Sequence, residues 1–167
     1  MTVHIQEWLR SIALPLIPQG ARVAEIGALN VNGSARDILG ARCGEWIGWD
    51  LVAGPGVDRV GQFHPADDEV FDLIVSCEAF EHDRQFWFTN QIARSAASRS
   101  RQAGGPGLYL ITVPGLTVPY HSYGGDFYRF TQDAFRQVFF EGFQILSLAA
   151  VGPAPHQNIC GLAVATA

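Results

Sequence analysis

The sequence is poor in cysteine and in charge. Its three cysteines, Cys43, Cys77 and Cys160, lie far apart and form no CxxC or Cys/His ligand spacing, so neither a disulfide framework nor a zinc site is indicated. Only 16% of the 167 residues are charged, with 11 basic against 16 acidic side chains and no basic cluster. Because binding to a nucleic acid requires many phosphates to be neutralised, we expect no nucleic-acid partner.

Long hydrophobic runs are also missing. No apolar stretch approaches the length of a membrane span, and residues 1–20 lack the charged start and apolar centre of a secretion signal. We therefore expect a cytoplasmic protein without a membrane span. Hydrophobic residues still make up 48% of the chain, which is enough for a real core, and 167 residues suit one domain.

The apolar segments alternate in type along the chain. Ile5, Trp8, Leu9 and Ile12 recur at helical spacing, which predicts an N-terminal helix and linker over residues 1–20. Strands are expected at 22–27, 45–51, 56–61, within 70–80, at 108–115, and as a final pair at 143–152 and 159–167. Further helices are expected from Ser34, which has capping-box spacing to Asp37, over 84–100, and after the cap residue Thr131.

This order predicts an α/β fold, a Rossmann-like three-layer sandwich with a mostly parallel sheet. The last two strands have no helix between them, which predicts an antiparallel edge strand at the C-terminus. The stretch from Asp50 to Val57 is shorter than the dozen residues of an ordinary parallel crossover, so we expect a reduced connection between the second and third strands.

Acidic residues fall at strand ends, where ligands of such sheets bind. Asp50 closes the second strand and can accept hydrogen bonds from both hydroxyls of a ribose. The turn after Gly27 lacks the glycine triplet of a dinucleotide site, because Leu29 stands at the second position and would crowd a pyrophosphate. A nucleoside without phosphates fits better. S-adenosylmethionine is such a ligand, since Glu25 suits its ammonium and the polar turn at Asn30 offers backbone donors for its carboxylate.

Four segments in order resemble a known family: VAEIGALNVNGS, WIGWDLVAGPGVD, FDLIVSCEAFEHD and HSYGGDFYRFTQDAF. Together they are similar to class I S-adenosylmethionine-dependent methyltransferases, in particular the type 11 methyltransferase domain. The resemblance implies S-adenosylmethionine as cofactor. It implies the following contacts: Glu25 and Gly27 with the methionine part, Asp50 with the ribose, Gln62 and Phe63 with adenine, and Cys77 and Glu78 at the floor of the site.

Methyl transfer requires mainly alignment and, for some acceptors, a base. His82 and His121 are the candidates for that base. The residues expected to shape the acceptor pocket are Tyr120, Tyr123, Asp126, Tyr128 and Arg129, and Asp126 and Arg129 could equally form a salt bridge that orders the loop.

We expect a small-molecule acceptor with an oxygen or nitrogen nucleophile. Methylation of a nucleic-acid base would call for a polar-Pro-Pro-aromatic turn, and the sequence has Ser-Cys-Glu-Ala at 76–79. Two alternatives remain open: a non-catalytic domain that binds S-adenosylmethionine or a protein partner on a degenerate methyltransferase scaffold, and a nicotinamide-dependent oxidoreductase, which Leu29 disfavours.

Overall fold

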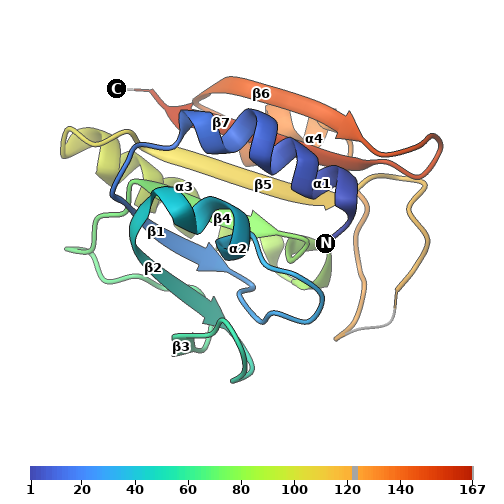
Figure 1. The fold of residues 1–167 in the computed structure, drawn as a ribbon, viewed down its shortest axis with the longest axis horizontal. Coiled ribbons are helices and arrows are strands. Elements are labelled where there is room, and N and C mark those ends of the chain that lie inside the picture. Colours follow the sequence, from blue (N-terminus) through green and yellow to red (C-terminus); the bar gives the residue numbers. More distant parts are fainter. Residues whose placement is uncertain (122–123, 167) are drawn as a thin grey trace.

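The structure is a computed structural model that describes residues 1–121 and 124–166. Its centre is a single sheet with helices on both faces (Figure 1). The strands are β1 (Ala21–Ile26), β2 (Cys43–Asp50), β3 (Arg59–Val60), β4 (Leu73–Cys77), β5 (Leu108–Pro114), β6 (Phe143–Val151) and β7 (Asn158–Ala165). Their order across the sheet is β3-β2-β1-β4-β5-β7-β6.

The predicted sheet is confirmed. Neighbouring strands from β3 to β5 pair in parallel, and β7 pairs antiparallel with both β5 and β6. The antiparallel C-terminal edge therefore consists of a hairpin in which β7 lies inside and β6 outermost. The short connection from β2 to β3 contains no helix between Leu51 and Asp58, as its length predicted.

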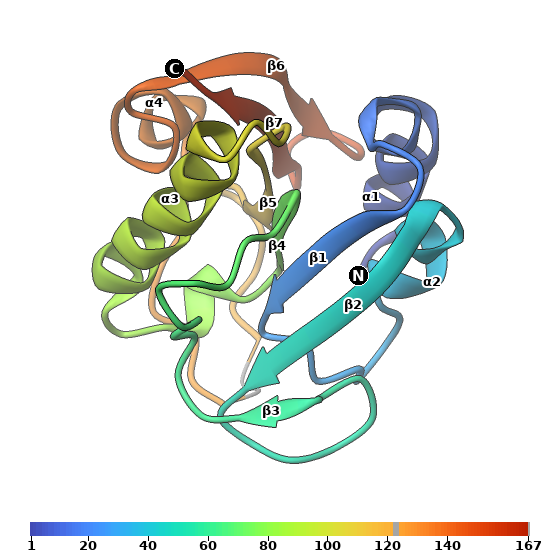
Figure 2. The same cartoon turned by 90° about the vertical axis from the view of Figure 1, so that its left-hand side faces the viewer.

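The helices divide into two layers. Figure 2 shows α1 (Val3–Trp8) and α2 (Arg36–Leu39) on one face of the sheet, and α3 (Phe86–Gln102) and α4 (Gln132–Ala134) on the other. α1 continues as a π-helical turn over Leu9–Ala13 and a 3₁₀ turn over Leu14–Leu16. None of the helices in the described part of the chain is long and apolar enough to cross a bilayer.

Local capping signals act nearly as expected. Thr131 accepts a hydrogen bond from the backbone N–H of Ala134, which starts the last helical segment. At α2, Asp37 accepts from the N–H of Ser34, whereas the Ser34 hydroxyl accepts from Arg36 instead of Asp37. Helix α2 begins at Arg36, the second of these donors, and is only about one turn long.

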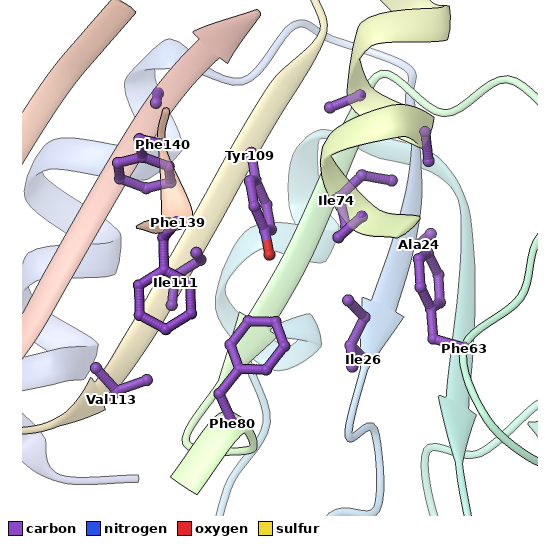
Figure 3. Packing of buried hydrophobic residues seen from close by; sticks show 14 of the residues in the cluster. Ala24, Ile26, Phe63, Ile74, Phe80, Tyr109, Ile111, Val113, Phe139 and Phe140 are labelled. Atoms are coloured by element: carbon purple, nitrogen blue, oxygen red, sulfur yellow. The ribbon is translucent and has the colours of Figure 1, made fainter. Parts of the chain in front are cut away.

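The two faces of the sheet have separate cores because strand side chains alternate. On the α3 face, small side chains of the helix allow it to lie close to the strands, and an aromatic cluster around Phe80, Tyr109 and Phe139 fills the remaining space (Figure 3). The buried Tyr109 hydroxyl donates to Asn90 Oδ1 at 2.9 Å. This packing fixes β5 and its neighbour β4, whose carboxyl end borders the site described next.

Candidate functional site

A cavity of about 960 Å³ lies at the carboxyl ends of β1, β2 and β4, within the size range of small-molecule sites. It brings together all ten residues that the sequence singled out: Glu25, Gly27, Asn30, Asp50, Gln62, Phe63, Cys77, Glu78, His82 and His121. These residues come from five separate segments of the sequence, 25–30, 50, 62–63, 77–82 and 121, and the fold makes them neighbours.

Gly27 forms the turn that closes β1. Its φ is +72°, a conformation that favours glycine, and a Cβ at this position would overlap the Cβ of Ala79 in the turn after β4. The N–H groups of Gly27 and Ala28 donate to the carbonyl of Trp49 at 2.9 and 3.0 Å. Glycine is thus required here by the packing of two protein turns.

The rest of this turn is fastened to the loop after β2. Asn30 N–H donates to the carbonyl of Pro55 at 2.8 Å, and the end of the Leu29 side chain lies against Gly54. Gly56 has a φ of +90°, and a Cβ there would come within 2.5 Å of the carbonyl oxygen of Ala28. The close backbone approach that a glycine triplet normally permits is provided here by glycines of the facing loop.

Asp50 is oriented by the same two loops. Its Oδ2 accepts from the N–H of Leu29 and its Oδ1 from the N–H of Val52, both at 3.1 Å. Each carboxylate oxygen has a second lone pair, so a fixed carboxylate at the cavity edge can still accept further hydrogen bonds.

Two other acidic residues of the cavity have raised pKa values: Glu25, which is buried, and Glu78, which is partly buried. Burial raises the pKa of Glu25 to about 7, although its Oε2 accepts from Trp46 Nε1 at 2.8 Å. Burial likewise raises the pKa of Glu78 to about 7, with its oxygens accepting from Thr112 Oγ1 at 3.1 Å and Asn158 Nδ2 at 2.7 Å. Glu78 also has a φ of +53°, which non-glycine residues rarely adopt. A bound cation would favour the ionised form of both groups.

The remaining predicted cofactor residues complete the walls. Phe63 is buried edge-on against Trp49, with ring centroids 5.2 Å apart, and the neighbouring Gln62 is exposed at the rim. Burial raises the pKa of the Cys77 thiol, which therefore stays protonated and serves as wall rather than nucleophile. The three cysteines are free, as expected.

The acceptor side differs from expectation. The cavity is lined there by Val118, Gly124 and Phe127, besides the two histidines. Of the residues expected to shape it, Tyr120 is exposed, and Asp126 and Arg129 form an ion pair. Tyr128 donates to the carbonyl of Arg84, and Tyr123 lies outside the described residues. The alternative role of Asp126 and Arg129, a salt bridge that orders the loop, is thus the one observed, and it lowers the pKa of Asp126 to about 2.

Sequence reasoning missed one residue, Glu81. It lies in the 3₁₀ turn Phe80–His82 with its side chain fully buried, and neither carboxylate oxygen has a hydrogen-bond partner among the described residues. Burial raises its pKa well above the usual range. The signal in the sequence was the Glu-His pair directly after a buried strand, of which only the histidine was selected.

Known proteins resemble this chain in structure but not in sequence. No family model matches the chain, and no curated protein matches it in sequence. Solved structures do match over nearly the whole chain. The 1,6-didemethyltoxoflavin-N1-methyltransferase of Burkholderia thailandensis has a TM-score of 0.65 at 17% identity, covering 98% of this chain and 77% of its own.

Two further structures agree. An S-adenosylmethionine-dependent methyltransferase of Mesorhizobium loti has a TM-score of 0.62 at 16% identity, covering 95% of this chain and 97% of its own. The magnesium protoporphyrin IX methyltransferase of Synechocystis with bound S-adenosylhomocysteine has a TM-score of 0.59 at 13% identity, covering 97% and 80%. The chain thus has the fold of class I S-adenosylmethionine-dependent methyltransferases, as the sequence motifs predicted.

Proposed function

We propose that this protein is an S-adenosylmethionine-dependent methyltransferase whose acceptor is a small molecule with an oxygen or nitrogen nucleophile. The observation that carries the proposal is the convergence of Glu25, Asp50 and Glu78 on one cavity at the carboxyl ends of the strands. The structural neighbours support it, because they include a small-molecule N-methyltransferase. They give no support to the alternative of a non-catalytic domain. We further propose a cytoplasmic location, on the sequence alone.

The cavity suits the charges of this cofactor. S-adenosylmethionine carries an ammonium and a sulfonium, and two buried carboxyl groups, Glu25 and Glu78, would regain their charge beside a cation. The chain contains no lysine, and Arg84 is the single arginine among the described residues that line the cavity. A pyrophosphate would therefore face carboxylates, which argues against a nicotinamide dinucleotide.

Each part of the cavity then has a role. Asp50 would hold the ribose, Phe63 and Gln62 would border the adenine, and Glu25, Gly27 and Asn30 would hold the methionine part, with Cys77 and Glu78 as floor. When bound, S-adenosylmethionine supplies an electrophilic methyl group. The chain has to align the acceptor and, where the nucleophile carries a proton, assist its loss. His82 and His121 are the residues that we propose for this assistance.

Calorimetry with S-adenosylhomocysteine tests the cofactor site. We expect binding by the unmodified protein and roughly hundredfold weaker binding by Asp50→Ala, because two charge-assisted hydrogen bonds are lost. Asp50→Asn, which keeps the shape of the side chain, checks that the loss is not caused by disorder of the loops. Asp67→Ala, in an exposed turn, is the matched control and should bind normally.

The acceptor side is tested by His121→Ala, which should bind S-adenosylhomocysteine normally but transfer methyl groups slowly. Absence of binding by the unmodified protein at about millimolar ligand, where an interaction is worth only about −4 kcal/mol, would refute the proposal. Normal binding by Asp50→Ala would refute the placement of the ribose.

A further inference from the structure

Three side chains at the mouth of the cavity point their ligand-type atoms at one spot. Nε2 of His82 and Nε2 of His121 are 3.2 Å apart, and Oε1 of Glu81 lies 3.7 Å from the first and 3.8 Å from the second. Within the described part of the chain, this is the one group of three such side chains whose ligand atoms lie close enough to share an ion.

The spacing matches the size of a coordination sphere. A circle through three atoms at these separations has a radius of about 2.1 Å, the length of a Zn–N or Zn–O bond. A point at bonding distance from all three atoms therefore exists without any movement of the side chains. Two histidines and one carboxylate are also a donor set that divalent transition metals use with positions left open.

The contacts at the two Nδ1 atoms leave the Nε2 atoms as the ring nitrogens that face the shared spot. Nδ1 of His82 contacts the carbonyl oxygen of Gly125, which can only accept, so the proton of the neutral ring resides on Nδ1. Nδ1 of His121 lies 3.4 Å from Oδ2 of Asp126, an ion-pair distance. A proton on each Nδ1 would leave two Nε2 lone pairs facing each other at 3.2 Å, an arrangement that a cation between them would stabilise.

Residues around the His121 ring hold it in place, in the way that outer-shell residues orient metal ligands. Asp126 is clamped by the guanidinium of Arg129, which also donates to the carbonyls of Val118 and Pro119 at 2.8 Å. A carboxylate behind a ligating histidine fixes its orientation and increases its basicity. The Glu81 side chain is completely buried and has no hydrogen-bond partner among the described residues. A neighbouring cation would offset the free-energy cost of burying its carboxylate.

We propose that Glu81, His82 and His121 bind a divalent transition-metal cation, with Zn²⁺ as the ion that fits their donor atoms and spacing. Binding of the ion stands independently of methyl transfer. Its use rests on the proposed function: both histidines line the cavity, so an ion that they hold would lie at the wall of the acceptor side. Such a site would favour acceptors with a hydroxyl, whose pKa the ion would lower, and the histidines would then assist through the ion instead of as free bases.

The test is a titration of chelator-treated, dialysed protein with Zn²⁺, in competition with a chromogenic chelator, together with the visible absorption of the Co²⁺ form. We expect one ion per chain with micromolar or tighter affinity. His121→Ala and Glu81→Gln should each weaken binding at least tenfold and change the Co²⁺ spectrum. His64→Ala, which removes an exposed histidine far from the group in sequence, is the matched control and should bind as the unmodified protein does.

Two crossed measurements separate this inference from the cofactor site. Asp50→Ala should bind Zn²⁺ normally, and His121→Ala should bind S-adenosylhomocysteine normally. Less than half an ion per chain, or equal affinity of His121→Ala and the unmodified protein, would overturn the inference. The histidine pair would then share a proton in place of a metal. A failure of S-adenosylhomocysteine binding with normal Zn²⁺ binding would overturn the proposed function alone.

Discussion

Replacement of Glu25 by glutamine should stabilise the protein at neutral pH. Glu25 is buried on β1, and its hydrogen bond from Trp46 does not offset the loss of hydration. A glutamine has nearly the same shape, and its carbonyl can accept the same hydrogen bond without carrying a charge. The gain expected from this change depends on pH in a defined direction.

The size of the expected gain in stability follows from the pKa of Glu25. Burial raises the pKa of Glu25 from 4.5 to about 7, which corresponds to about 3 kcal/mol of preference for the protonated form. Below pH 4.5 the carboxyl is protonated in both the folded and the unfolded chain, so Glu25→Gln should have little effect. Between pH 4.5 and 7 only the unfolded chain ionises, and the free energy of unfolding falls as pH rises. At pH 8 the variant should be more stable by about 3 kcal/mol.

Urea denaturation at pH 4.5, 6 and 8 measures this difference. Glu69→Gln is the matched control with the opposite sign, because the hydrogen bond from Arg59 lowers the pKa of Glu69 to about 2. That variant should be destabilised at neutral pH and should approach the unmodified protein only below pH 4. A free energy of unfolding for Glu25→Gln that is equal to or below that of the unmodified protein at pH 8 would refute the reasoning.

Two substitutions test the packing around the site. Gly56→Ala and Gly104→Ala both place a side chain at positive φ, but only the side chain at position 56 meets a backbone atom, the carbonyl oxygen of Ala28. Gly56→Ala should therefore destabilise the protein by about 2 kcal/mol more than Gly104→Ala in urea denaturation, and it should weaken S-adenosylhomocysteine binding. Equal effects of the two variants would contradict the loop contact. Tyr109→Phe removes a buried hydrogen bond to Asn90 and should lower the thermal midpoint by about 2–4 °C, whereas an unchanged midpoint would show that the bond contributes nothing.

The sheet was predictable because the signals for it are local. Five apolar segments ending in polar or glycine residues gave the parallel strands, and the missing helix between the final two segments gave the antiparallel edge. The order of β6 and β7 was not predictable, since both strands have similar apolar character and only pairing with β5 distinguishes them. Element ends moved by a few residues: α3 begins at Phe86, where position 84 was expected.

The site was predictable where a strand end fixes a residue's place and less so where a loop does. Glu25 and Asp50 lie at the ends of β1 and β2, Glu78 directly follows β4, and the sheet brings them to one edge. The loop after β5 carries no such constraint, because its course depends on the Asp126–Arg129 ion pair and on contacts with the turn after β4. The proposed metal site could not be predicted from Cys/His spacing within one segment, since His82 and His121 are 39 residues apart.

The interrupted glycine motif after β1 shows how a long-range contact can replace a local rule. The glycines of a glycine triplet allow two backbone segments to approach each other closely. Such an approach is possible whichever of the two facing loops contains the glycines. Here Ala28, Leu29 and Asn30 lie against 54–56, where two of three residues are glycine, and the turn is held by the Asn30–Pro55 hydrogen bond. The same contact presents the N–H of Leu29 to Asp50. Asp50 therefore remains oriented at the edge of the cavity although the glycine motif is interrupted. A comparison between distant relatives has to include both loops and not the first turn alone.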